Sequence, residues 1–191
     1  FPVNLRRKDG GVMECLMRFA GNPVGQSKLA REAAMANNTV AAGYVELLAD
    51  LLCVSTAYAW DASRQRTNRR KPCKFHFTNL LAAVTWHGSG IRTPQEFLLL
   101  EEEEQGHWQE WLVAQELWRR AARRGDEFAD SMHFWQSREH EVDFVLSPES
   151  FLEVKRGSCS PLDFAWFPKV FPKGHLRVIN ANRFETDAVS G

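Results

Sequence analysis

The sequence has no excess of charge of either sign. Its 191 residues contain 24 lysines and arginines against 24 aspartates and glutamates, so the formal net charge is zero. A polyanionic partner therefore finds no favourable field over the whole molecule. Any nucleic-acid binding must depend on local basic segments.

Long apolar runs are also missing, because no stretch of about 18 apolar residues occurs. The N-terminus lacks the basic and then apolar pattern of a signal peptide. The cysteines Cys15, Cys53, Cys73 and Cys159 include no C-x-x-C pair. We therefore expect no membrane span and a cytoplasmic protein with reduced thiols. The chain opens at Phe1 rather than Met, which predicts a piece of a longer protein.

The composition is that of an ordinary globular chain, with 44% hydrophobic and 25% charged residues. A chain of this length can bury one large core or two small ones. Between residues 85 and 94, two glycines and a proline interrupt the apolar periodicity. We therefore predict two domains, residues 1–88 and 94–191.

The first half predicts three short helices followed by two strands. Apolar residues recur at helical spacing over residues 12–19 and 40–51, and good helix formers fill residues 28–34. We expect Thr39 to be the N-cap of the third helix. Residues 53–60 and 74–78 are typical of strands, and a polar loop joins them. This order predicts a winged helix-turn-helix.

The polar loop is the one concentrated basic segment of the chain. It contains Arg64, Arg66, Arg69, Arg70 and Lys71. On a wing, these side chains would lie along phosphates. The third predicted helix holds no lysine or arginine over residues 39–50, which argues against base-specific reading in the major groove. Two interpretations stay open: non-specific contact with a nucleic-acid backbone, or a structural or protein-binding winged helix whose charged loop is solvated.

The second half predicts an α/β domain with one mixed sheet. A helix over residues 107–120 ends in a run of arginines, and Gly125 closes it. Short apolar strands follow over residues 132–136, 141–146 and 150–155. Ser160, with a proline behind it, begins another helix, and residues 176–180 form a last strand.

Charged residues stand on two of these apolar strands. Glu153 and Lys155 are two apart and therefore project from one face of their strand, and Asp143 lies on the preceding strand. Two carboxylates can hold Mg²⁺ or Mn²⁺, which activates water for phosphodiester hydrolysis, while a lysine orients the water or stabilises charge. We predict Asp143 and Glu153 as metal ligands and Lys155 as the electrostatic group.

Regular strand pairing would separate these residues. With a four-residue turn over residues 147–150, Asp143 would lie opposite Val154, on the wrong face for Glu153. We therefore predict a bulge near Pro148 that shifts the register by one residue. The alternative interpretation is that Glu153 and Lys155 form only the solvated face of an edge strand.

The pattern Asp143, then Glu153-Val154-Lys155, resembles the PD-(D/E)xK nuclease superfamily, which contains restriction enzymes and Holliday-junction resolvases. The resemblance implies a restriction-endonuclease-like α/β domain with a mixed central sheet. It also implies a further glutamate on the helix before the motif strands. The matching position is Glu110, as a catalytic residue and metal ligand.

Along nearly its whole length, the chain also resembles the uncharacterised C-terminal region of a family of prokaryotic AAA-type ATPases. The matching segments, in one order, are residues 20–24, 27–32, 74–78, 110–117, 141–144 and 151–155. The resemblance implies a P-loop ATPase in front of this region, and ATP would bind only there. It implies a winged helix and a nuclease-like domain, but it names no activity.

Two functions are expected from these residues. In the first, the chain is the C-terminal part of an AAA-type ATPase and carries a Mg²⁺-dependent DNA endonuclease domain and a DNA-binding winged helix. In the second, a catalytically inactive nuclease-like module binds DNA or a protein partner. The two differ in whether the chain is an enzyme, a metal-dependent phosphodiester hydrolase.

Overall fold

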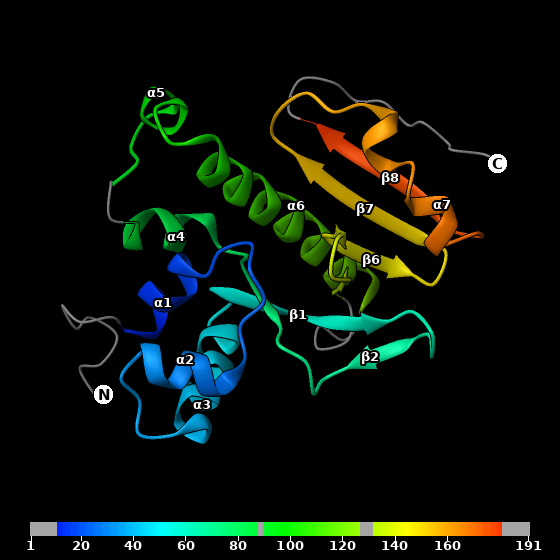
Figure 1. Ribbon diagram of the computed structural model, residues 1–191. Coiled ribbons are helices and arrows are strands. Elements are labelled where there is room, and N and C mark those ends of the chain that lie inside the picture. The colour runs from blue at the N-terminus through cyan, green and yellow to red at the C-terminus, as the bar shows by residue number, and fades with distance from the viewer. Residues whose placement is uncertain (1–10, 88–89, 127–131, 181–191) are drawn as a thin grey trace.

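The computed structural model describes residues 11–87, 90–126 and 132–180 as a mixed α/β structure (Figure 1). The helices are α1 (Val12–Arg18), α2 (Gln26–Glu32), α3 (Asn38–Asp50), α4 (Leu80–Trp86), α5 (Pro94–Leu98), α6 (Glu102–Arg124), the 3-10 helix η3 (Pro161–Phe164) and α7 (Phe167–Val170). The strands are β1 (Val54–Asp61), β2 (Arg66–Asn68), β3 (Lys74–Phe77), β4 (His133–Gln136), β5 (Glu141–Val142), β6 (Phe144–Ser147), β7 (Ser150–Lys155) and β8 (His175–Asn180).

Two sheets contain both parallel and antiparallel neighbours, which confirms the mixed α/β class. β1 pairs antiparallel with β2 and β3 and parallel with β4, and β4 pairs with β5. In the other sheet β7 lies between β6 and β8. The expected single central sheet of the second half is wrong, because β4 and β5 join β1 from the first half. The division into residues 1–88 and 94–191 stays a prediction, and residues 88–89 of the predicted boundary lie outside the described part of the chain.

The chain passes from one sheet to the other at Asp143. We expected one strand over residues 141–146, but β5 ends at Val142 and β6 begins at Phe144. Both flanking residues are fully buried, and they belong to different apolar cores. Residues two apart on a regular strand share a face. Their separation therefore requires the backbone to bend at Asp143, and one predicted strand becomes two.

The first part of the chain folds largely as its periodicity predicts, with α1, α2, β1 and β3 within two residues of the expected ranges. The prediction of Thr39 as the N-cap of α3 is wrong, because the N-cap is Asn37, two residues earlier. Asn37 has extended backbone, and its side chain accepts a hydrogen bond from the Val40 N–H at 3.0 Å. Asparagine is among the best N-caps and stabilises a helix by about 1 kcal/mol relative to alanine.

The sequence does not predict the short elements β2 and α4. The polar loop contains β2, which pairs with the end of β1. Its sequence, Arg66-Thr67-Asn68, has no apolar residue, so no strand periodicity was visible. The segment before the predicted boundary forms α4, which the side chain of Asn79 caps by accepting from two backbone N–H groups.

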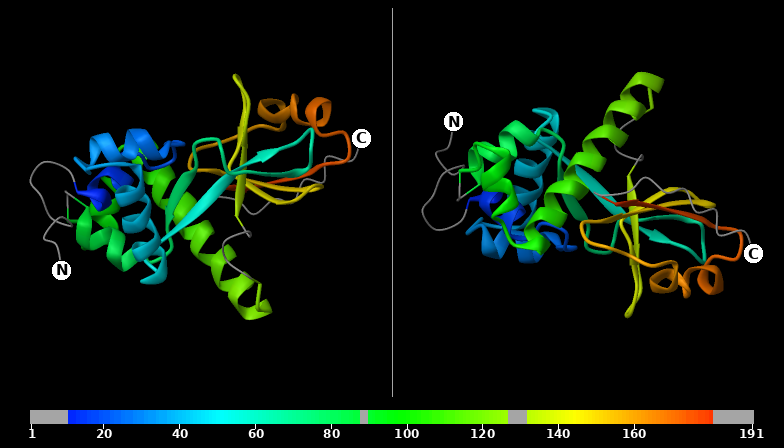
Figure 2. Two further views of the ribbon diagram at one scale, coloured as in Figure 1. Left: turned by 90° about the horizontal axis from the view of Figure 1, so that it is seen from below. Right: turned by 90° about the horizontal axis from the view of Figure 1, so that it is seen from above.

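The long helix α6 packs against strands of both sheets, β3 of the first and β7 of the second (Figures 1 and 2). It begins at Glu102, five residues before the expected start, and ends at Arg124, followed by Gly125, whose φ of 73° is typical of a C-cap glycine. Trp111 packs in a core with α1 to α4 and β3, whereas Ala114 packs in a second core with β1, β4, β6 and β7. A third core lies between β5 to β8 and α7.

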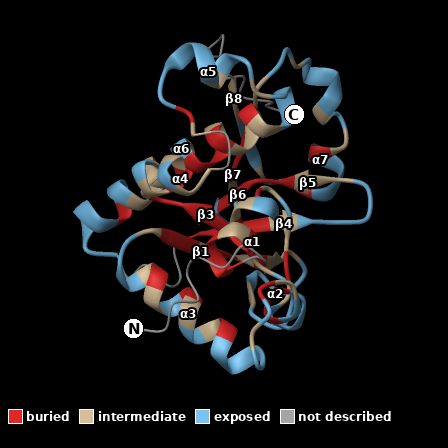
Figure 3. Cartoon of the chain, turned by 90° about the vertical axis from the view of Figure 1, so that its left-hand side faces the viewer, coloured by how far each residue is buried: buried red, intermediate tan, exposed pale blue. Residues whose placement is uncertain are grey.

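Buried residues gather in β1, β3 and β7, while the outer faces of α3 and α5 are exposed (Figure 3). Among the described residues, no helix is both long enough and apolar enough to cross a membrane. Two of the cores meet at Asp143, which follows a residue of one core and precedes a residue of the other. A group of polar side chains fills this junction.

Candidate active site

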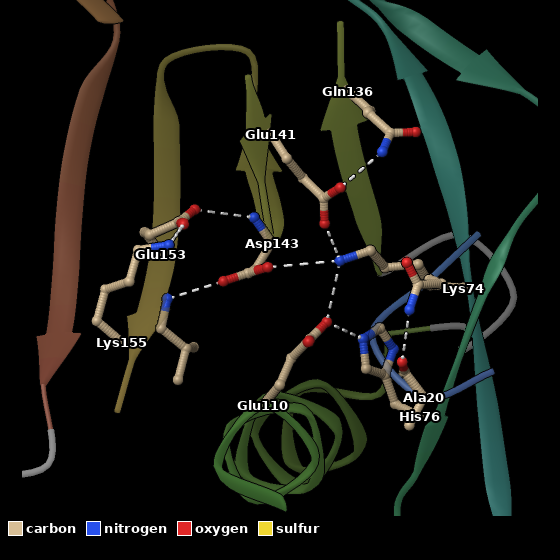
Figure 4. A network of polar contacts seen from close by, with 11 residues as sticks. Ala20, Lys74, His76, Glu110, Gln136, Glu141, Asp143, Glu153 and Lys155 are labelled. Carbon is tan, nitrogen blue, oxygen red and sulfur yellow. Dashed lines mark hydrogen bonds and ion pairs between the residues drawn. The ribbon is translucent and has the colours of Figure 1, made fainter. Parts of the chain in front are cut away.

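The structure brings Asp143, Glu153 and Lys155 together, as the sequence predicts (Figure 4). The backbone N–H of Asp143 donates to Glu153 Oε2 at 3.2 Å, and Lys155 Nζ lies 2.6 Å from Glu153 Oε1. The N–H of Val154 donates to Asp143 Oδ2 at 2.9 Å. The two carboxylates are therefore held by backbone groups of each other's segments.

A register shift makes this contact possible, and the predicted irregularity is confirmed. β6 and β7 change their pairing by one residue between Val145 and Ser147, just before Pro148. Because of the shift, Asp143 lies level with Glu153 instead of one residue beyond it.

The strand that carries Glu153 lies in the middle of its sheet. β7 pairs with β6 on one side and with β8 on the other. Glu153 is only 5% exposed. The interpretation of Glu153 and Lys155 as the solvated face of an edge strand is therefore wrong.

A lysine that the sequence analysis did not select lies at the centre of the site. Lys74, the first residue of β3, is 1% exposed. Its Nζ lies 3.3 Å from Glu110 Oε1 and 3.4 Å from Asp143 Oδ1, and it forms an ion pair with Glu141. The predicted helix glutamate, Glu110, thus reaches the site across Lys74 from Asp143 (Figure 4).

Glu110 has a second partner on β3. His76 Nε2 lies 2.9 Å from Glu110 Oε1, and its other ring nitrogen, Nδ1, has no hydrogen-bond partner among the described residues. Lys74 and His76 stand two apart on a buried strand, and this is the same signal that selected Glu153 and Lys155. Residues 74–78 are predicted only as a strand of the winged helix. Their two ionisable side chains on one face are the signal that could have placed them in the site.

Negative charge exceeds positive charge in this cluster. Four carboxylates meet two ammonium groups, so the cluster would carry two negative charges in excess if all six groups were ionised. The carboxylates are Glu110, Glu141, Asp143 and Glu153, and the ammonium groups are Lys74 and Lys155. Uncompensated charge is costly in a site that is mostly buried.

The excess charge acts most strongly on Asp143. Burial raises the pKa of Asp143 well above its ordinary value, and the charges of Glu110 and Glu153 raise it further. Burial also opposes ionisation of Glu110, but the His76 hydrogen bond and the charge of Lys74 outweigh it and lower the pKa of Glu110 to about 2. Asp143 is therefore the carboxylate most in need of a proton or a cation.

The donor set fits one Mg²⁺ or Mn²⁺ held by Asp143 and Glu153. Both offer hard carboxylate oxygens, and Mg²⁺ is commonly bound through one or two carboxylates with water in its other positions. Among the described residues, no three His, Cys, Asp or Glu side chains are grouped so as to hold a metal ion. Lys74 stands between Glu110 and Asp143, so the role of Glu110 as a third ligand stays a prediction.

The predicted nucleic-acid-binding residues lie on β2 and the segments around it, and all of them are exposed. They are Arg64, Arg66, Arg69, Arg70 and Lys71. Arg66 pairs with Asp61 of β1, whereas Lys74 pairs with Ala57 of the same strand. These two positions on β1 are about 13 Å apart at 3.3 Å per residue. The structure does not bring the basic residues into the carboxylate cluster, but β2 and the Lys74 strand β3 both pair with β1.

Comparisons of the chain with protein-family models, with curated proteins and with solved structures found no match. The resemblance to nucleases and to the C-terminal region of ATPases thus stays a prediction from the sequence.

Proposed function

We propose that this chain is a metal-dependent DNA endonuclease module that forms the C-terminal part of an AAA-type ATPase. In this proposal, α1 to α3 with β1 to β3 act as a winged helix-turn-helix, and the later elements act as the nuclease-like part. The observation that carries the proposal is the composition of the cluster around Asp143 and Glu153, in which four carboxylates meet only two ammonium groups. One divalent cation would neutralise the excess of carboxylates.

The arrangement of side chains suits phosphodiester hydrolysis. When bound by Asp143 and Glu153, Mg²⁺ supplies a water of lowered pKa and neutralises charge on the phosphate. The Lys155 side chain is 44% exposed, and its ammonium lies 2.6 Å from Glu153 Oε1, so this charge stands beside a metal ligand, where it would orient the water or stabilise the phosphate. The hydrogen bond from Val154 to Asp143 fixes the ligand before substrate binds.

The exposed basic segment supports DNA as the substrate. Five cationic side chains lie on β2 and its flanks, in a chain that has no net charge. A duplex carries one phosphate per about 1.7 Å of its axis. A single duplex could therefore lie along β2 and also reach the carboxylate cluster on the neighbouring strands.

A second candidate function is a nuclease-like module without catalysis, which binds DNA or a protein partner. Lys74 favours it, because its ammonium already compensates part of the charge of Glu110 and Asp143. This candidate predicts binding without cleavage.

Cleavage of labelled linear, branched and single-stranded DNA, with Mg²⁺ or Mn²⁺ and with EDTA, decides between the two. We expect metal-dependent cleavage that Asp143→Ala abolishes and that Glu149→Ala, an exposed carboxylate on the same hairpin, leaves unchanged. Cleavage that is absent, or equal in all three proteins, would move the conclusion to the binding module.

The basic segment gives a separate prediction for DNA binding. We expect the triple substitution Arg66→Gln, Arg70→Gln and Lys71→Gln to weaken binding to duplexes of any sequence. It should also reduce the slope of log affinity against log salt by about 3, since each phosphate contact contributes roughly 0.9. Fluorescence anisotropy with labelled duplexes at several salt concentrations measures both.

The control is the double variant Arg119→Gln and Arg120→Gln, which removes two exposed arginines of α6. This pair should leave the salt slope of the wild type in place. An unchanged slope in the triple variant would show that the basic segment does not touch phosphates.

A further inference from the structure

The Lys74 ammonium stands where several elements meet. Lys74 comes from β3, and its three carboxylate partners come from α6, from β5 and from the bend between the two sheets. Lys74 also donates hydrogen bonds to Glu110 and Asp143, which lie 36 and 69 positions away from it in the sequence. Only the folded chain can assemble this arrangement.

Carboxylate oxygens surround the Lys74 ammonium. Three carboxylates each direct one oxygen at it, and carboxylate oxygens are the ligands that Mg²⁺ and Mn²⁺ prefer. Its side chain is 2% exposed, so water supplies little of its solvation. His76 holds the shared oxygen of Glu110 from the other side.

We propose that Glu110, Glu141 and Asp143 form a second cation position, and that the ammonium of Lys74 fills it. This inference rests on the proposed function, which puts a divalent cation between Asp143 and Glu153. The site then takes one divalent ion, and the protein supplies the second cation. Glu141 becomes part of the site, and Glu110 serves Lys74 instead of the metal.

The geometry also makes the first half of the chain part of the active site. Lys74 lies on β3, which packs against α6 and pairs with β1. A displacement of β3 would remove a positive charge from Asp143 and free a place for a second ion. If Lys74 formed only a structural ion pair, its removal would lower stability and leave the number of bound ions unchanged.

Counting bound Mn²⁺ on the full 191-residue chain tests the proposal, by electron paramagnetic resonance of the free ion and by calorimetry. We expect one ion for the wild type and for Lys74→Arg, and two for Lys74→Met. Removal of a positive charge 3.4 Å from a carboxylate oxygen should strengthen binding at the emptied position at least about ten-fold. The double variant Lys74→Met with Glu110→Gln, which lacks one of the three ligands, should lose most of this gain.

An equal number of ions with equal affinity in the wild type and Lys74→Met would overturn the proposal. If Lys74→Met is unfolded without metal, circular dichroism during a Mn²⁺ titration becomes the measurement. Recovery of the folded signal supports a second cation position, and failure to recover at millimolar Mn²⁺ rejects it. Cleavage by the wild type is scored separately, so a gain of one ion without cleavage would reject the nuclease and keep the cation position.

Discussion

Replacing Lys155 with methionine is expected to slow DNA cleavage by about 10²- to 10⁴-fold while metal binding persists. Methionine keeps most of the aliphatic side chain and removes the charge that would orient water or stabilise the phosphate. The bound metal ion would compensate the buried Glu153 carboxylate that loses this partner, so the fold should survive in the presence of metal. Single-turnover cleavage together with Mn²⁺ calorimetry measures both effects.

Asp143→Asn tests a metal ligand, whereas Lys155→Met tests a residue that does not bind the metal. It should lose cleavage and metal binding together, since Asp143 would hold the ion directly. Lys173→Met, an exposed lysine outside the cluster, is the matched control and should behave as the wild type. Full cleavage by Lys155→Met would remove this lysine from the chemistry, whatever else the site does.

The core of this site could be predicted because its signals are local. Charged residues two apart on an apolar strand point to one face, and Glu153 and Lys155 do so. The need for a register shift followed from counting residues between Asp143 and Glu153, and the shift lies within two residues of the expected place. Short-range rules of pairing and periodicity were sufficient for this part.

The rest depended on contacts between distant segments. The parallel pairing of β1 with β4 joins the two halves of the chain, and no periodicity reveals which strands become neighbours. Lys74 and Glu141 enter the site only through that pairing. The bend at Asp143 was likewise hidden, because Val142 and Phe144 are both apolar and the sequence does not say that they enter different cores.

The position of the site follows from the same arrangement. The cluster lies beside α6, which contributes to two of the apolar cores, and its charged groups are largely screened from water. Low local polarity strengthens each ion pair but also penalises any charge left without a partner. An unequal number of carboxylates and ammonium groups in such a place is therefore more informative than the same imbalance on a surface.

The substitution Glu110→Gln is expected to lower the free energy of unfolding at pH 7 by about 2 kcal/mol. The pKa of Glu110 falls from its ordinary 4.5 to about 2 in the folded protein, because Lys74 and His76 outweigh the effect of burial. That shift corresponds to roughly 3 kcal/mol. Part of this free energy would be recovered, because Asp143 ionises more readily beside Lys74 when the charge of Glu110 is removed.

The effect of Glu110→Gln should depend on pH with a definite sign. Glu110 takes up its proton near pH 4.5 when the chain is unfolded, but only near pH 2 when it is folded. Its contribution is therefore complete above pH 4.5 and is lost as the pH falls from 4.5 toward 2. Urea unfolding of the wild type and the variant at several pH values should show the gap narrowing over that window. Glu116→Gln, at a half-exposed position on the same helix, should produce little change at any pH because its ion pairs are screened by water. A gap for Glu110→Gln that stays constant with pH would contradict the buried ion pair.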